Sequence, residues 1–217
     1  RIVINGATTV DSSGSSQLIN ISTRSEVLTG DSVMIAGFTI LGSDPLDVLI
    51  RAVGPTLADA PNNISGAIEN PTVELFKTDF TQNPPQSNPV DIPQNPNTEW
   101  GGLSELADAM TLVGAFDLPT DSNDAAMRAS LTEGVYTAIV RGVDNGTGIG
   151  LVEVYDESIH SNPDANVSLF NISTRAFVGS NQDSVMIAGF TVIGDKPQKL
   201  LIRAQGPGVG LPAGATA

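Results

Sequence analysis

Residues 18–56 read LINISTRSEVLTGDSVMIAGFTILGSDPLDVLIRAVGPT, and the pattern returns at residues 169–207 as LFNISTRAFVGSNQDSVMIAGFTVIGDKPQKLLIRAQGP. The second copy carries one extra residue before Asp183. A repeated stretch of this kind marks a repeated supersecondary unit, and such a unit cannot bury its apolar face alone. We name residues 18–56 head 1, residues 57–156 the body and residues 169–207 head 2.

The heads carry the alternation and turn signals of β-strands. In head 1 we expect strands at about 18–23, 32–41 and 46–53, with turns at Thr29–Asp31 and Gly42–Pro45. Segment 32–41 is almost continuously apolar, which is typical of a strand buried on both faces or packed against another module.

The body continues the β pattern with one interruption. Strands are expected near 72–77, 125–131, 134–141 and 148–155, and one helix is expected at 103–113, where apolar residues share a face and Gly114 follows. Residues 81–98 contain five prolines and many amides, so we expect a loop without regular structure.

These elements predict an all-β protein: a β-sandwich of jelly-roll or Ig-like type with one short helical insertion, plus a partial second copy of the same module. The expected organisation is an N-terminal strand or arm at 1–17, a complete module at 18–156, a linker at 157–168 and an incomplete second copy at 169–217.

Charge and composition narrow the partners. The net charge is −14, and only ten basic residues are spread through 217 positions, so a nucleic-acid partner is not expected. No apolar run is long enough to span a bilayer, so membrane insertion is not expected either. Charged residues make up only 16% of the chain, and the many hydroxyl and amide side chains are typical of extracellular β-proteins.

The chain contains no cysteine, which a module of this size does not need for stability and which is also compatible with a cytosolic origin. It opens with RIVINGATTV, which is already strand-like and has no initiator methionine. We therefore expect a mature or excised segment whose leader has been removed.

Five motifs occur in a fixed order along the first module. They are NISTR (Asn20–Arg24), IAGF (Ile35–Phe38), LIRAVGP (Leu49–Pro55), GAF (Gly114–Phe116) and the strands from Tyr136 to Asp156, which end in LVEVYD. In this order they resemble a β-rich repeat module of very long secreted or cell-surface proteins of environmental bacteria. The resemblance implies a structural or adhesive surface module and carries no shared chemistry.

The inventory of catalytic residues is poor. His160 is the only histidine and lies in the polar linker, so neither a Ser-His-Asp triad nor a histidine-rich zinc site is expected. We predict that the chain is not an enzyme. No cofactor is expected, with calcium as the one candidate ligand: Asp121, Asn123 and Asp124 place oxygen-bearing side chains in one loop. The competing interpretation is that these residues form Asx turns.

Basic residues that recur in both heads are notable because the chain has so few. Arg51 and Arg203 lie within the apolar LIRA segments of head 1 and head 2. We expect each to be a structural residue, partly buried and paired with a carboxylate or with strand-end carbonyl groups.

The chain has two heads and one body, so one head is left over. Its strands would expose unpaired backbone groups and apolar side chains unless another chain covers them. The N-terminal strand is the natural segment to complete a neighbour's surplus head, and exchange of heads between chains is the alternative. The expected interface residues are Ile2, Val3, Ile4, Val185, Met186, Ile187, Phe190, Val192, Leu200, Leu201 and Ile202.

The sequence therefore favours an extracellular or surface-displayed structural protein whose partners are copies of itself. Filaments or arrays would form by intermolecular strand pairing, with adhesion or matrix building as the use. If the polypeptide continues and the second body is simply missing from this segment, the result is still a surface repeat protein. A calcium- or carbohydrate-dependent binding module of a longer secreted protein is the alternative function.

Overall fold

The computed structural model describes residues 5–7, 16–180 and 184–206 of the chain. Its strands are β1 (Asn5–Ala7), β2 (Gln17–Val27), β3 (Met34–Gly42), β4 (Leu46–Val53), β5 (Pro71–Asp79), β6 (Gln86–Pro89), β7 (Ala125–Leu131), β8 (Gly134–Gly142), β9 (Gly148–Asp156), β10 (Val167–Arg175) and β11 (Ile187–Ile193). The α-helices are α1 (Pro55–Ala58), α2 (Ser104–Leu112) and α3 (Ser158–Ser161).

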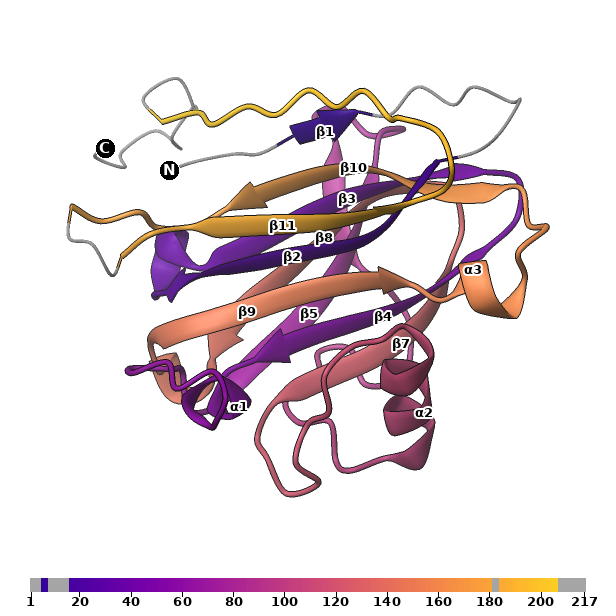
Figure 1. Cartoon of the computed structure of the whole chain (residues 1–217). Coiled ribbons are helices and arrows are strands. Elements are labelled where there is room, and N and C mark those ends of the chain that lie inside the picture. The colour runs from indigo at the N-terminus through magenta and orange to yellow at the C-terminus, as the bar shows by residue number, and fades with distance from the viewer. Residues whose placement is uncertain (1–4, 8–15, 181–183, 207–217) are drawn as a thin grey trace.

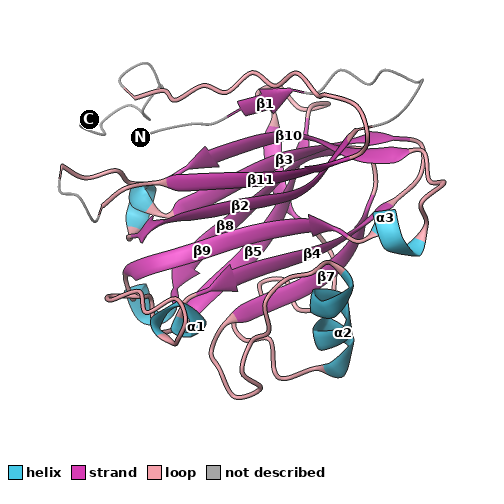
Figure 2. Ribbon diagram, in the orientation of Figure 1, coloured by secondary structure: helices cyan, strands magenta, loops and turns pink. Residues whose placement is uncertain are grey.

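The strands form one connected, curled sheet with few helices (Figures 1 and 2). Its order is β6-β5-β8-β3-β10-β2-β9-β4-β7, with β1 added on β10 and β11 added on β2. A single residue pair, Leu169 with Leu18, joins β10 to β2. The predicted all-β fold class is thus confirmed. The strands are connected as one curled sheet, and the predicted β-sandwich is not confirmed.

Both halves of the curled sheet contribute to one apolar core. Alternate residues of β3 point into it, because successive side chains of a strand face opposite sides, and the buried row on this strand is Met34, Ala36, Phe38 and Ile40. Opposite them lie Ile50 of β4 and Val154 of β9, in the same cluster. Figure 2 shows the sheet curling over this space.

A second core lies on the other face of β4 and β9, under α2 and the loops around it. Leu49 and Val53 of β4 pack there with Trp100 and with Leu106 and Met110 of α2. Strand β4 is therefore buried on both faces. For segment 32–41 the sequence led us to expect a strand buried on both faces or packed against another module. In the structure the outward residues Ile35, Gly37 and Thr39 of β3 are half-buried, and β3 pairs with β10 of head 2.

Other expectations need correction at the margins. Residues 81–98 are not free of regular structure, because Gln86–Pro89 forms β6 on the exposed edge of β5. Proline is tolerated there because an edge strand needs no partner for every N–H group. The expected linker at 157–168 contains α3, and β10 begins within it at Val167. Of the predicted N-terminal strand 1–10, the described part is β1.

Candidate strand-exchange interface

The two heads meet in the middle of the sheet. In the repeat, β10 of head 2 corresponds to β2 of head 1, and β11 corresponds to β3. Strand β10 lies beside β3, and β11 lies beside β2 (Figure 1). Each head thus pairs its strands with those of the other head, and β2 and β3 do not pair with each other.

The two exchanged pairings have the same register. Strand β10 pairs with β3 through Ile35 with Arg175, Ala36 with Thr174, Gly37 with Ser173, Phe38 with Ile172 and Thr39 with Asn171. Strand β11 pairs with β2 through Ile187 with Arg24, Ala188 with Thr23, Gly189 with Ser22, Phe190 with Ile21 and Thr191 with Asn20. Every pair in the first set corresponds to a pair in the second, so the exchange is reciprocal.

Equivalent residues of the heads also touch each other. Leu18 pairs with Leu169, and the hydroxyl groups of Thr23 and Thr174, both fully buried, share a hydrogen bond of 2.9 Å. Contact between equivalent residues is the signature of an isologous interface, in which the same surface is used twice. The heads therefore meet as two copies of one self-complementary unit.

The inward residues of β10 anchor head 2. Leu169, Ile172 and Thr174 are buried in the interface with head 1. Burial of a leucine or isoleucine side chain contributes about 1.5–3 kcal/mol. This pairing corrects the expectation that head 2 has no partner within its own chain, because β10 and one edge of β11 are paired there.

The connection between body and head 2 is fastened at both ends. At its start, the buried carboxylate of Glu157 accepts hydrogen bonds from Arg128 Nε at 3.0 and 3.1 Å, which raise the pKa of Arg128. At its end, the carbonyl of Asn166 accepts from the backbone N–H of Ser43 at 2.9 Å. Gly42 permits this approach, because a Cβ added there would lie 2.0 Å from that carbonyl oxygen.

No strand of the described residues covers the far side of head 2. Most of the predicted interface residues lie there and are exposed: Val185, Ile187, Phe190, Val192, Leu201 and Ile202. Met186 is partly buried against the main core, and Leu200 is half-buried. Ile2, Val3 and Ile4 lie outside the described residues. The described part of the N-terminal strand, β1, pairs with β10 of the same chain.

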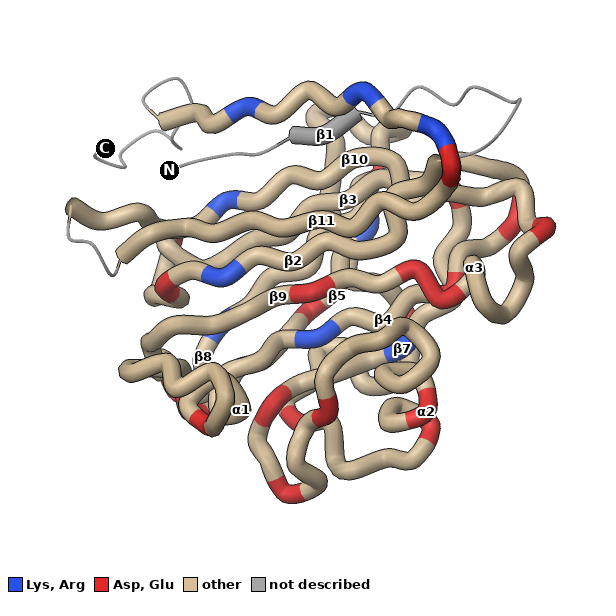
Figure 3. Tube along the Cα trace, viewed as in Figure 1, with Lys and Arg blue, Asp and Glu red and all other residues tan. Residues whose placement is uncertain are grey.

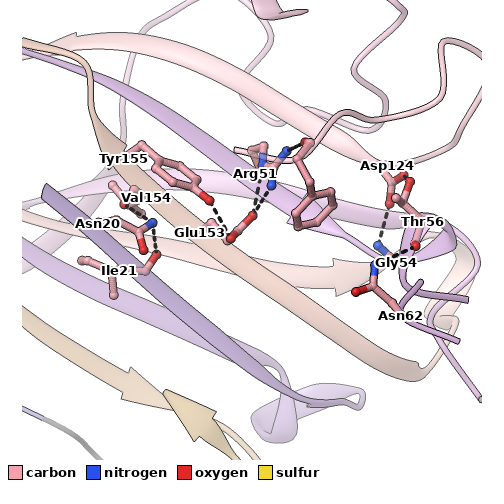
Figure 4. A network of polar contacts seen from close by, with 11 residues as sticks. Asn20, Ile21, Arg51, Gly54, Thr56, Asn62, Asp124, Glu153, Val154 and Tyr155 are labelled. Atoms are coloured by element: carbon pink, nitrogen blue, oxygen red, sulfur yellow. Dashed lines mark hydrogen bonds and ion pairs between the residues drawn. The ribbon is translucent and has the colours of Figure 1, made fainter. Parts of the chain in front are cut away.

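Arg51 lies at the centre of a buried polar network on β4 and β9 (Figure 4). It donates from Nε to Glu153 Oε2 at 3.0 Å and from a terminal nitrogen to the Phe116 carbonyl at 2.6 Å. Its guanidinium also stacks 4.3 Å from the centre of the Phe116 ring. Such a charge-assisted, fully bonded arrangement fixes the two strands relative to each other.

Tyr155 completes this network. Its hydroxyl donates to Glu153 Oε1 at 2.8 Å (Figure 4). Burial and the adjacent Glu153 carboxylate raise the pKa of Tyr155 well above its ordinary value, so the hydroxyl stays protonated and remains a donor.

Arg203, the counterpart of Arg51, does not reproduce the network. It is exposed, and the LIRA segment of head 2 forms no strand in the described part of the chain. The partner of Arg51, Glu153, belongs to the body, and among the described residues no carboxylate takes the corresponding place beside Arg203. The expected burial of Arg203 is therefore wrong for this structure.

The candidate calcium residues do not converge. Asp124 is fully buried, and its carboxylate accepts hydrogen bonds from the Gly54 backbone N–H at 2.6 Å and from the Thr56 hydroxyl (Figure 4). Asp121 and Asn123 are exposed. Asp124 thus ties β7 to the start of α1, and no cluster of three or more acidic or histidine side chains suited to a metal is found among the described residues.

Sequence reasoning missed the residues that join the heads, Thr23, Leu169, Ile172 and Thr174. The repeat itself carried the signal, because closely similar strands in two copies can pair between the copies as well as within one copy. It also missed Glu153, Phe116 and Tyr155 as the partners of Arg51, because they are distant in sequence and only the fold brings them together.

Comparison with known proteins finds no matching family model, no matching curated protein and no matching solved structure. Within the described residues, no helix is long and apolar enough to cross a membrane.

Proposed function

We propose that this chain is a structural protein of the cell surface or extracellular space that assembles into filaments or arrays. Assembly occurs by β-strand pairing between the heads of neighbouring chains, and adhesion or matrix building is its use. The observation that carries the proposal is the identical register of the two exchanged pairings, β3 with β10 and β2 with β11. The proposal assigns the chain no catalytic role.

The contact that joins the heads within one chain is equally available between chains. The segment between Glu157 and Asn166 is the covalent link between the body and head 2, so it can act as the hinge of a swap once its contacts with Arg128 and Ser43 open. When head 2 of one chain pairs with head 1 of the next chain, the same backbone and side-chain pairs form as within one chain. Repeated head to tail, this exchange gives an open assembly.

The exposed apolar surface of head 2 and the composition of the chain also support the proposal. The open edge of β11 and the exposed apolar side chains of head 2 are features that monomeric proteins normally avoid. The low content of charged residues and the resemblance to repeats of secreted bacterial proteins favour a place outside the cell.

A cysteine lock tests the proposal. The chain has no cysteine, and the half-buried pair Ile35 and Arg175 faces outward across β3 and β10. Directly opposed residues of antiparallel strands have Cα atoms about 4.5–5.5 Å apart, within the range of a disulfide. Ile35→Cys with Arg175→Cys, oxidised at high dilution, would hold head 2 on its own head 1.

The oxidised lock is expected to remain monomeric in light scattering as its concentration is raised. The same variant after reduction, the parent chain and the single variant Ile35→Cys under reducing conditions should form fibres or arrays in electron micrographs. Assembly by the oxidised lock would show that head exchange is not the contact. Monodisperse particles from the parent chain would favour the alternative, a binding module of a longer secreted protein.

A further inference from the structure

In head 1, strands of the body pair with the edges of the repeated strands. The edge of β3 that faces away from β10 pairs with β8, through Phe38 with Tyr136 and Ile35 with Ile139. The edge of β2 that faces away from head 2 pairs with β9, and β4 lies between β9 and β7. Each strand of head 1 therefore has a strand of the body on at least one edge.

Head 2 has closely similar sequences, but no described strand covers it in the way that β8 covers β3. No described strand pairs with β11 on the edge opposite β2. Phe38 is 1% exposed and its counterpart Phe190 is 40% exposed. Leu49 and Ile50 are both 0% exposed, whereas their counterparts Leu201 and Ile202 are 61% and 59% exposed. The uncovered residues of head 2 are the ones that the body covers in head 1.

One edge of head 2 already accepts a strand in the corresponding place. On β10, β1 pairs Asn5 with Ser173 and Gly6 with Ile172. On β2, β9 pairs Glu153 with Ser22 and Val154 with Ile21. Ser173 and Ile172 are the counterparts of Ser22 and Ile21, so β1 occupies for three residues the position that the longer β9 takes on head 1.

The net charges of head 2 and of the body are opposite in sign. Head 2 contains four basic and two acidic residues, whereas the body contains three basic and fifteen acidic residues. Figure 3 shows basic residues along the segment after β11 and acidic residues mainly on the loops around α2 and α3. A second body would thus bring negative charge to a positively charged head.

From these observations we infer that the side of head 2 facing away from head 1 is a docking site for a second body of this kind whose β8 and β9 are not paired with a head 1 of their own, since both edges of these two strands are occupied within this chain. The incoming β8 pairs with β11, so that its Tyr136 lies opposite Phe190. The incoming β9 replaces β1 on β10 and brings its Glu153 to Arg203. The inference deepens the proposed strand-pairing function and rests on it, because both use the heads as the assembly element.

The test extends the chain. In the extended chain, residues 1–207 are followed by a second copy of residues 56–156, in the order that head 1 and the body follow each other. The variant Val192→Cys then reports, through its rate of reaction with a maleimide, whether β11 is covered. In the original chain this exposed position should react rapidly with a maleimide, and in the extended chain its reaction should slow by at least about 100-fold, as expected of a residue reached only by local opening.

Two matched positions serve as controls. Ile40→Cys is the counterpart of Val192→Cys in head 1, is fully buried and should be protected in both chains. Phe80→Cys is exposed and should react rapidly in both.

Rapid reaction of Val192→Cys in the extended chain, with Ile40→Cys still protected, would overturn the inference. Loss of protection at Ile40→Cys would also overturn it, because it would show the added body competing for head 1. Either result would leave the proposed function standing if the cysteine lock still controls assembly.

Discussion

Arg51 and Arg203 occupy the same position of the repeat, yet only Arg51 is buried and paired with a carboxylate. A buried charge that loses its partner is strongly destabilising, because the remaining charge has no solvent to screen it. The two positions therefore provide a matched pair in which the same substitution acts in a covered and in an uncovered head.

Arg51→Gln is expected to lower the free energy of unfolding by about 3–5 kcal/mol, because it leaves Glu153 buried without its counter-charge. Arg203→Gln should leave the stability of the parent chain unchanged within error. Urea denaturation of both variants measures the difference. Equal losses at the two positions would mean that head 2 is covered as head 1 is.

Asp156 gives the fold a pH dependence. Burial raises its pKa to about 6, although its carboxylate accepts hydrogen bonds from the Ser158 N–H at 2.8 Å and from Gln17 Nε2 at 2.9 Å. A carboxyl group whose pKa is raised by folding binds its proton more tightly in the folded chain. Its contribution to stability is therefore full below about pH 4 and is lost as the pH rises through about 6.

Asp156→Asn removes this titration. Between pH 4 and pH 6.5, the stability of the parent chain minus that of Asp156→Asn should fall as the pH rises, and then stay constant. Thermal denaturation at several pH values measures the difference, which cancels the titration of the other carboxylates. A difference that is flat or rises over this range would rule out the buried, protonatable state of Asp156.

At the scale of single residues, the sequence predicted the partners that composition or local pattern determines. An arginine within an apolar strand requires a partner, so a paired Arg51 was foreseeable. Which carboxylate it meets depends on β4 and β9 lying side by side, and nothing near Arg51 in the sequence encodes that. Asp124 was a candidate calcium ligand because a loop of oxygen-bearing side chains has the same sequence pattern whether it binds an ion or bonds to the backbone; in the structure its carboxylate accepts hydrogen bonds from the Gly54 N–H and the Thr56 hydroxyl.

At the scale of elements, alternation and turn residues made most strands and α2 predictable. The partners of the strands were not predictable in the same way. NISTR and IAGF occur in both heads, so the local sequence suits pairing within a head or between heads equally well. The structure places β10 between β3 and β2, which makes pairing between heads the arrangement that closes the sheet.

The hydrogen bond between the buried hydroxyl groups of Thr23 and Thr174 allows the contact between the two heads to be tested. Each single change, Thr23→Val or Thr174→Val, leaves one buried hydroxyl without a partner and should cost about 1–3 kcal/mol. The double variant removes both hydroxyls and should cost clearly less than the sum of the two single changes. Chemical denaturation of the four chains gives the coupling energy, and additive effects would mean that the two heads do not meet at this point.

At the scale of the whole molecule, head 1, the body and the inner side of head 2 form one covered sheet, and no strand in the described part of the chain covers the outer side of head 2. The sequence predicted the imbalance of two heads and one body by counting parts. It did not predict that the surplus head returns to its own chain, because counting gives the number of strands and not the reach of the connection between them. An assembly follows when the same head reaches a neighbouring chain instead.

The most direct test of head exchange between chains mixes two single-cysteine variants, Ile35→Cys with one tag and Arg175→Cys with another. They are unfolded together, refolded at high concentration and oxidised, and mass spectrometry identifies the disulfide-linked species. Head exchange predicts a heterodimer linked through these two positions, in a yield well above that from the out-of-register pair Thr39→Cys and Arg175→Cys. Equal, background yields from both pairs, with all chains folded, would contradict it.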